Sequence, residues 1–318
     1  MSQYKSNPRQ LFILLILLLL SSHTNAAVNS SAGTSAFSFL KIDASARAVS
    51  MGGAFTGLAN DESALYYNPA GIAQFESKRF IASYHNYFVD MQSGFLGFIK
   101  PLSQEKYFLG LHITYLNYGK FIETDIAGNE LGNFSGSDIV VAGSFAFKKG
   151  HSWKFGATTK LIYEKIHDYS ATGLAFDLGI KFSSDREYYN AGLMVQNLGL
   201  QMTALGDEKE KLPLTVRAGG AIKLKGLPLL LTSDIILPTD NNMALAVGGE
   251  YSQLKPFYIR AGWNTFGSNY QAANSSDNWA GLGLGFGFDF KEKMHIAYAF
   301  TPGAELGDSH RITLSGGF

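Results

Sequence analysis

Most of the chain alternates apolar residues with small or polar ones, position by position. From Leu282 to Phe290, for example, every second residue is Leu or Phe, and the residues between them are glycine or Asp289. Successive side chains of a β-strand point to opposite faces, so each such run predicts a strand with one apolar face. About fourteen runs of this kind follow one another. The expected strands are 79–88, 93–101, 106–118, 137–148, 153–167, 171–183, 187–197, 212–224, 228–237, 243–252, 255–264, 279–290, 293–301 and 309–318.

Charged residues within these runs fall on the face that is not apolar. Asp177 and Lys181 share one such face, and Arg217 and Lys223 share another. A charge that meets lipid at the bilayer midplane is costly, so this pattern predicts an apolar face toward lipid and a polar face toward a lumen. Charged residues make up only 16% of the chain, against about 25% in typical soluble domains. The alternative is a soluble β-sandwich or propeller, which would expose fewer phenylalanines at a strict period of two.

Prolines support the same division into strands. Proline cannot donate a ladder hydrogen bond, so a sheet keeps it out of strand interiors. The prolines at the ends of the expected strands are Pro101, Pro213, Pro228, Pro238, Pro256 and Pro302. The pattern therefore predicts an all-β, transmembrane antiparallel β-barrel of about fourteen strands.

The connections between the expected strands alternate in length. The long ones, at 119–136, 198–211 and 265–278, all follow odd-numbered strands, and those after even-numbered strands are short. Outer-membrane barrels have short periplasmic turns, long external loops and an even number of strands. We therefore expect both ends of the barrel to face the periplasm.

Residues 1–26 have the features of a signal peptide. Lys5 and Arg9 precede the apolar run 11–20, and small residues follow at 24–26. This run is shorter than the roughly twenty residues that span a bilayer, which disfavours a retained membrane anchor. We expect cleavage after Ala26 and export to the bacterial outer membrane. The chain has no cysteine, so neither a lipoprotein anchor nor a disulfide framework is expected.

The last strand and the tryptophans agree with a membrane barrel. Trp153, Trp263 and Trp279 fall at strand ends, where an aromatic girdle forms. The chain ends on Phe318, and alternate residues before it are apolar or glycine. This ending resembles the terminal strand that the barrel-assembly machinery reads. Outer-membrane lipid and that machinery are therefore expected partners.

Residues 27–78 lack the strand pattern and are expected to form a plug inside the barrel, which would occupy 79–318. Small residues dominate 45–54, which suits an element packed in a narrow space. Asp61 is expected to cap a short helix that ends before the turn signal Asn68-Pro69.

Over residues 37–75 the sequence resembles the N-terminal plug of the FadL superfamily, and most closely its PorV/PorQ branch. In that branch a Phe-Leu-x-Ile element, here Phe39 to Ile42, precedes Ala-Arg-Ala and Met-Gly-Gly elements. The residues that carry the resemblance include Arg47, Met51, Gly52, Gly53, Asp61, Glu62, Asn68, Pro69, Ala70 and Gly71.

The resemblance implies a fourteen-stranded barrel with its N-terminal segment in the lumen, and it leaves two classes of function open. PorV acts in type IX secretion, where it receives exported cargo, so one class is a non-enzymatic receptor or scaffold for secretion components or exported proteins. FadL is a channel for long-chain fatty acids, so the other is a channel for a hydrophobic small molecule. The mostly small or charged inward residues, and Phe121, Leu131 and Phe134 in the longest expected loop, favour the first class.

Charges on the lumen side have mixed signs, whereas a charge-selective pore carries a ring of one sign. They are Lys160, Asp177, Lys181, Arg217, Asp234, Glu250, Arg260 and Asp289. We hypothesise that Arg47 and Asp61 or Glu62 of the plug dock onto these wall charges.

The sequence gives little support for catalysis, for a cofactor or for a metal site. His112 and His295 are inward candidates, but no Gly-x-Ser-x-Gly elbow occurs in the chain and no nucleophile can be assigned to them. Asp61-Glu62 has no further ligand at a useful spacing. The net charge is zero and no basic patch stands out, which argues against nucleic acid. We expect a protein without enzymatic activity.

Overall fold

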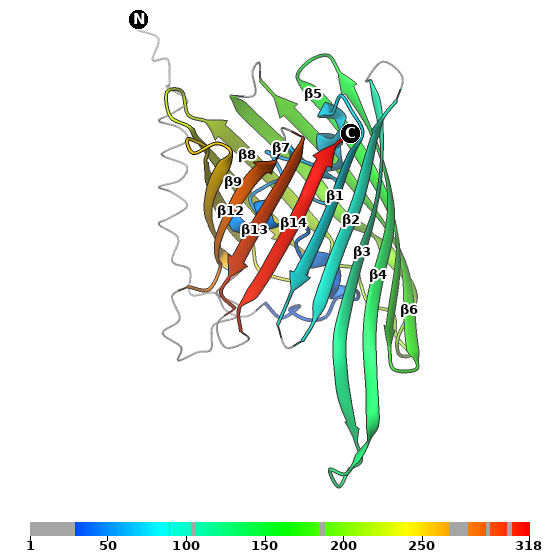
Figure 1. Ribbon diagram of the computed structural model, residues 1–318. Helices are drawn as coiled ribbons and strands as arrows, with labels where there is room; N and C mark the ends of the chain where they lie inside the picture. The colour runs from blue at the N-terminus through cyan, green and yellow to red at the C-terminus, as the bar shows by residue number, and fades with distance from the viewer. Residues whose placement is uncertain are drawn as a thin grey trace, which may run out of the picture.

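The computed structural model describes residues 29–88, 90–102, 106–184, 188–266, 279–290, 293–303 and 307–318; the predicted signal peptide, residues 1–26, lies outside them. The described chain forms a closed barrel of fourteen antiparallel strands, in which β1 pairs with both β2 and β14 (Figure 1). The predicted fold class is confirmed. The strands are β1 Arg79–Asn86, β2 Gln92–Pro101, β3 Tyr107–Thr124, β4 Glu130–Lys149, β5 Trp153–Ile166, β6 Tyr169–Ser183, β7 Tyr189–Thr203, β8 Thr215–Lys223, β9 Leu229–Pro238, β10 Ala244–Tyr251, β11 Phe257–Asn264, β12 Leu282–Phe290, β13 Met294–Thr301 and β14 Ser309–Gly317.

The expected long loop at 119–136 is wrong. β3 and β4 continue through it as one hairpin, whose turn at 125–129 is held by the Asp125 carboxylate. Most residues on both faces of this extension are exposed, so no period-two pattern marks it. β7 likewise runs on to Thr203, past its expected end at residue 197. The β3–β4 hairpin extends beyond the other strands at the end of the barrel opposite the C-terminus (Figure 1).

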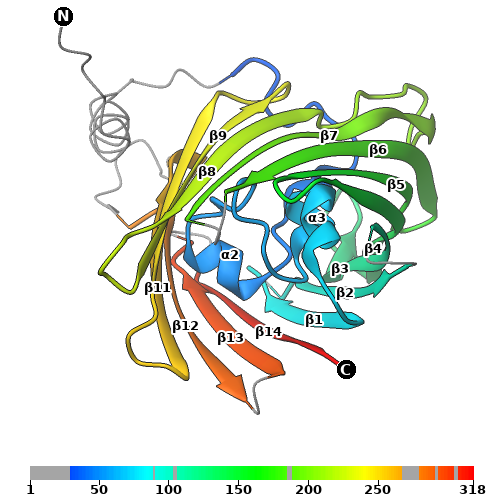
Figure 2. The ribbon, with the colours of Figure 1, turned by 90° about the horizontal axis from the view of Figure 1, so that it is seen from above.

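The plug consists of short helices joined by irregular chain, and it lies inside the barrel (Figure 2). The helices are η1 Ser38–Lys41, α2 Ala46–Ser50, α3 Ala64–Tyr67 and η2 Pro69–Gln74. None of the helices in the described part of the chain has the length and apolar character that a membrane span requires.

Side chains before each plug helix determine where it begins. Ser45 caps α2 by accepting from the amide of Ala48 at 3.3 Å, and Asn68 caps η2 by accepting from the amide of Ala70 at 3.1 Å. Asp61 does not hold the predicted cap position, because Ser63 is the N-cap of α3. The Asp61 carboxylate instead accepts from the amide of Ser63 at 2.9 Å, one step before the helix.

Glycines on the inner wall let the plug backbone touch the strands directly. A Cβ on Gly262 would lie 2.1 Å from the carbonyl carbon of Met51, and one on Gly283 would lie 2.3 Å from the carbonyl oxygen of Val49. On the other side of the lumen, a Cβ on Gly156 would lie 2.4 Å from the backbone of η2. The inward glycines therefore act as seats for the plug.

We expect Gly262→Val to displace the plug. The new side chain would overlap the backbone at Met51, and overpacking of this kind costs about 1–3 kcal/mol or more. Limited proteolysis of the refolded protein should cut the plug faster, while the barrel stays heat-modifiable on gels. Gly94→Val is the matched control, since a Cβ there meets only the carbonyl oxygen of Ser83 at 3.7 Å. Equal protection of the plug in both variants would contradict the prediction.

Candidate functional site

Charged wall residues bind the irregular backbone of the plug. Lys181 is completely buried, and its ammonium group donates to the carbonyls of Leu58 and Ala59, the latter at 2.9 Å. Backbone groups outside a helix or ladder need other partners when buried, and a buried ammonium group needs acceptors. Lys181 and this segment of the plug therefore satisfy each other.

Arg217 and Asp234 likewise bind the plug backbone, at a segment that precedes Leu58 in the chain. Arg217 donates to the carbonyl of Gly53 at 2.6 Å. Asp234 accepts from the amides of Phe55 and Thr56 at 3.1 and 2.9 Å, and it also accepts from Arg217 at 3.3 Å. These predicted lumen charges thus hold the plug through its main chain rather than through its charged side chains.

Arg47 is where a charged side chain of the plug does meet the wall. Its guanidinium donates to both oxygens of Glu250 on β10, at 2.8 and 3.0 Å, and to Asn60 and Asp61 at 2.7 and 3.0 Å. Burial alone would lower the pKa of Arg47, but the carboxylates of Glu250 and Asp61 raise it above its ordinary value. Arg47 stays charged and ties two parts of the plug to the wall.

The network continues along the wall from Glu250. Arg260 donates to Glu250 at 2.6 Å and to the Nε2 of His295 at 3.0 Å. His295 in turn contacts Asp289 at 2.6 Å, and the Tyr258 hydroxyl donates to the same carboxylate at 2.5 Å. The sequence placed Glu250, Arg260, Asp289 and His295 on one face, but only the structure joins them in one chain of contacts.

Glu62 binds a wall residue that is not among the predicted lumen charges. Arg79, the first residue of β1, contacts its carboxylate at 2.5 Å. Burial and the neighbouring charge of Asp61 raise the pKa of Glu62, against the opposing effect of Arg79. Arg79 was missed because it lies at the very end of a strand, where the alternation gives no signal.

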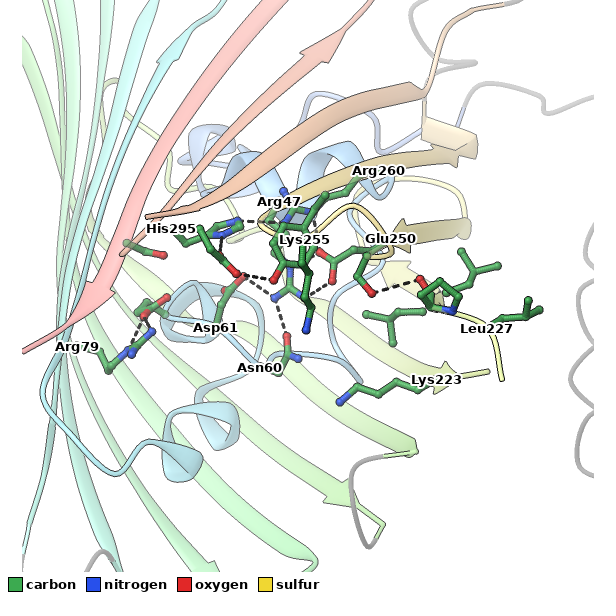
Figure 3. A pocket seen from close by; sticks show the side chains of 18 residues that line it. Arg47, Asn60, Asp61, Arg79, Lys223, Leu227, Glu250, Lys255, Arg260 and His295 are labelled. Carbon is green, nitrogen blue, oxygen red and sulfur yellow. Dashed lines mark hydrogen bonds and ion pairs between the residues drawn. The ribbon is translucent and has the colours of Figure 1, made fainter. Parts of the chain in front are cut away.

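One end of the barrel carries the C-terminus and the short turns that follow even-numbered strands, and we call it the short-turn end. The residues of the Arg47 network and the Glu62–Arg79 pair line a polar cavity of about 380 Å³ at this end (Figure 3). Arg47, Asp61 and Glu250 meet in its centre, and Lys223, Lys255 and Arg79 lie around them (Figure 3). In the part of the chain that the structure describes, no three His, Cys, Asp or Glu side chains are close enough to hold a metal ion.

A second cavity, of about 590 Å³, opens at the other end of the barrel, among the connections after β1, β9, β11 and β13. We call it the external vestibule. Its wall is partly apolar, and the apolar side chains include Leu40, Ile42, Tyr66, Phe88, Ile236 and Leu282. Tyr66 contributes to its lining from the plug. The vestibule therefore combines an apolar lining with polar groups.

Arg311 of β14 is the notable polar group of the external vestibule. It is 4% exposed and its Nη2 donates to the Nδ1 of His85 at 2.7 Å. Its Nη1 has no hydrogen-bond partner, and no carboxylate of the described residues forms an ion pair with it. A buried guanidinium without an anion is unfavourable, so this group is suited to an acidic ligand.

The N-terminal segment forms one rim of the external vestibule. Asp240, in the loop after β9, accepts from Ser35 and from Lys41, each at 2.5 Å. Burial raises the pKa of Asp240, but these two hydrogen bonds lower it by more than burial raises it. The pKa of Asp240 therefore lies below its ordinary value. Residues 35–41 are thereby fixed to the wall.

The wall beside the external vestibule contains a seam between β7 and β8. Their ladder ends at Gln196, although β7 continues. Beyond it, Asn197 donates through its side chain to the carbonyl of Pro213 at 3.2 Å, and Gln201 accepts from the amide of Glu210 at 2.8 Å. Side chains therefore replace the ladder here.

Beside the seam, β7 has a bulge where its register with β6 shifts, and a buried ion pair supports this bulge. Lys160 contacts Asp177 at 2.6 Å and the side-chain oxygen of Asn197 at 2.8 Å, and the amide of Asn197 donates to Asp177 at 2.8 Å. Asn197 has a φ of 61°, a left-handed conformation that Asn tolerates better than most residues. The predicted lumen charges Lys160 and Asp177 thus hold the wall rather than the plug.

Most of the remaining predicted residues are buried in the plug or the lumen, where they pack against neighbouring groups. Met51 and Ala70 are completely buried, and Gly71 packs against the carbonyl of Ala59. His112, the other histidine candidate, is buried beside Phe95 at a ring distance of 5.2 Å. Phe318 is 65% exposed, and its role in assembly stays a prediction.

We expect Arg47→Met to loosen the plug. Removing one partner of a buried ion pair costs about 3–5 kcal/mol, because the other charge is left unpaired. Urea titration followed by proteolysis should show the plug released at lower urea. Lys165→Gln is the control, since Lys165 is exposed on β5. Unchanged protection of the plug in Arg47→Met would refute the docking hypothesis.

A model of an uncharacterised protein family, UPF0164, matches residues 20–175 of the chain. No curated protein sequence matches this chain significantly.

Solved structures with a similar fold include hydrocarbon channels and transporters. The toluene transporter TbuX of Ralstonia pickettii is 12% identical with a TM-score of 0.63, covering 87% of this chain and 99% of its own. The toluene transporter TodX of Pseudomonas putida is 13% identical with a TM-score of 0.59, covering 86% of this chain and 97% of its own. At these identities the likeness concerns the fold. The chain therefore has the fold of these channels, a closed β-barrel of fourteen antiparallel strands with short N-terminal helices.

Proposed function

We propose that the protein is a non-enzymatic outer-membrane channel that admits a mostly apolar small molecule carrying an acidic group. The observation that carries this proposal is the external vestibule with the unpaired guanidinium of Arg311. Small-molecule sites are mainly apolar cavities with a few polar anchors. A hydrophobic carboxylate would cover the apolar lining and neutralise Arg311, whereas an uncharged hydrocarbon would leave the arginine unpaired.

The seam between β7 and β8 supports a route for the ligand. Passage straight through the lumen requires the plug to break its contacts with Arg217, Asp234 and Glu250. Gln196 and Asn197 line the external vestibule and also border the seam. A sideways exit there would break few hydrogen bonds.

Binding of decanoate and of 1-decanol to the purified protein in nanodiscs tests the proposal. The two probes share a chain, and only decanoate carries a charge. We expect decanoate to bind more tightly, and Arg311→Gln to reduce its affinity about tenfold or more, because hydrogen bonds to a charged group are worth about 1.5–3 kcal/mol. Affinity for 1-decanol should stay the same.

Lys120→Gln is the control for this experiment. It removes a positive charge from the exposed β3–β4 hairpin, away from the external vestibule. If wild type binds both probes equally, the ligand needs no acidic group. If it binds neither, the channel proposal fails.

One observation favours a second function, the receptor for secretion components or exported proteins that the resemblance implies. The β3–β4 hairpin projects beyond the barrel (Figure 1) and carries exposed apolar side chains, with Ile122 60% and Leu131 63% exposed. Clustered apolar side chains on a surface are typical of protein-binding sites.

Affinity purification from native outer membranes, with mass spectrometry of the retained proteins, tests this second function. Stoichiometric secretion components or exported proteins should be retained by wild type and lost from Ile122→Ser/Leu131→Ser. Thr124→Ser, on the same hairpin, should retain them. Wild type purified alone would rule against the receptor.

A further inference from the structure

The lipid-facing side of the barrel has a depression over β2 to β6. Its floor consists of the small outward residues Gly143, Ala157 and Thr159, which lie on the adjacent strands β4 and β5. Gly143 pairs with Thr159 in the ladder. A Cβ on Gly143 would meet only the Leu111 side chain, at 3.9 Å. The depression has a volume of about 450 Å³.

Large apolar side chains surround this floor. Each floor residue is paired with at least one of these large side chains on a neighbouring strand. The rim consists of Phe98, Leu109, Leu111, Phe145, Phe176 and Leu178. A concave apolar surface within the membrane-facing wall takes hydrocarbon rather than water.

Three exposed lysines lie toward the short-turn end of the depression. Lys100 is on its rim and pairs with Leu109. Lys106 precedes β3, with its ammonium group 5.5 Å from the Tyr107 ring, and Lys149 ends β4. The amide of Lys148 donates to the carbonyl of Lys106 at 3.0 Å, which brings the two turns together.

The aromatic residues at this end mark the membrane interface. Tyr107 begins β3, and Trp153, the ladder partner of Lys149, begins β5. Tyr and Trp gather where hydrocarbon gives way to lipid headgroups. The lysines therefore stand at headgroup level, below an apolar depression. Glu105, which precedes Lys106 in the sequence, lies outside the described residues.

We propose that this depression is a binding site for an anionic phospholipid of the leaflet that faces the short turns. One acyl chain lies over Gly143, Ala157 and Thr159, and the phosphate contacts Lys100, Lys106 and Lys149. Lysines near a membrane surface attract anionic lipids, each by about fivefold in affinity. A zwitterionic lipid offers the same chain without the net charge. No residue of the external vestibule takes part, so the site is independent of the proposed channel function.

Native mass spectrometry of the delipidated full-length barrel, titrated with phosphatidylglycerol or phosphatidylethanolamine of the same chains, tests the site. Wild type should prefer phosphatidylglycerol. Lys100→Gln/Lys149→Gln should weaken phosphatidylglycerol about 25-fold and phosphatidylethanolamine much less, because the ammonium group of phosphatidylethanolamine offsets the charge of its phosphate. Ala157→Leu/Thr159→Leu, which fills the depression, should weaken both lipids by about fivefold or more.

Matched controls separate this site from general effects of charge and volume. Lys165→Gln removes a lysine near the opposite end of β5, and Ala261→Leu enlarges an exposed residue on β11. Both should bind lipid as wild type does, and every variant should keep the heat-modifiable barrel.

Three outcomes would overturn the proposal. The first is equal binding of the two lipids in wild type and in the lysine variant. The second is a filled depression that changes only the oligomeric state, which would make this face a contact between copies. The third is displacement of phosphatidylglycerol by lipid A, which would move the phosphate site to the other leaflet.

Discussion

The structure depends on supplying hydrogen-bond partners to the backbone of a plug that has little regular structure. Its helices are only a turn or so long, so most of its amides and carbonyls lack helical partners. Once the plug enters the barrel, water is no longer available to them. Lys181, Arg217 and Asp234 supply the missing partners, and wall glycines bring the backbone close enough for these bonds. The inward face is therefore rich in charge and glycine because it complements a main chain.

The sequence predicted the barrel because the lipid boundary imposes a two-residue period on every strand. Where that boundary ends, the signal ends too: the tip of the β3–β4 hairpin is exposed on both faces, and it was expected to be a loop. The same period placed the inward charges on the correct face, since a charge on the other face would meet lipid.

The partner of each inward charge could not be predicted. Arg47 and Glu250 are 203 residues apart, and their contact depends on the path of the plug as well as on the strand register. Arg47 does bind a wall charge, as hypothesised, whereas Asp61 forms an ion pair with Arg47 itself. Lys181 donates to carbonyls of the plug. A charge on a known face can pair with a side chain or a backbone group, and the pattern does not distinguish the two.

The two ends of the lumen differ in how completely their charges are paired, and this difference points to where a ligand can bind. At the short-turn end each carboxylate of the Arg47 network already accepts from a donor, so an added anion would compete with Glu250 or Asp289. In the external vestibule Arg311 has only His85. The seam lies at the same end, where a few side-chain bonds, each worth about 1 kcal/mol, replace a strand ladder. A wall held this way opens at lower cost than one held by a continuous ladder, so the unpaired cation and the weakest part of the wall favour entry and exit on the same side of the plug.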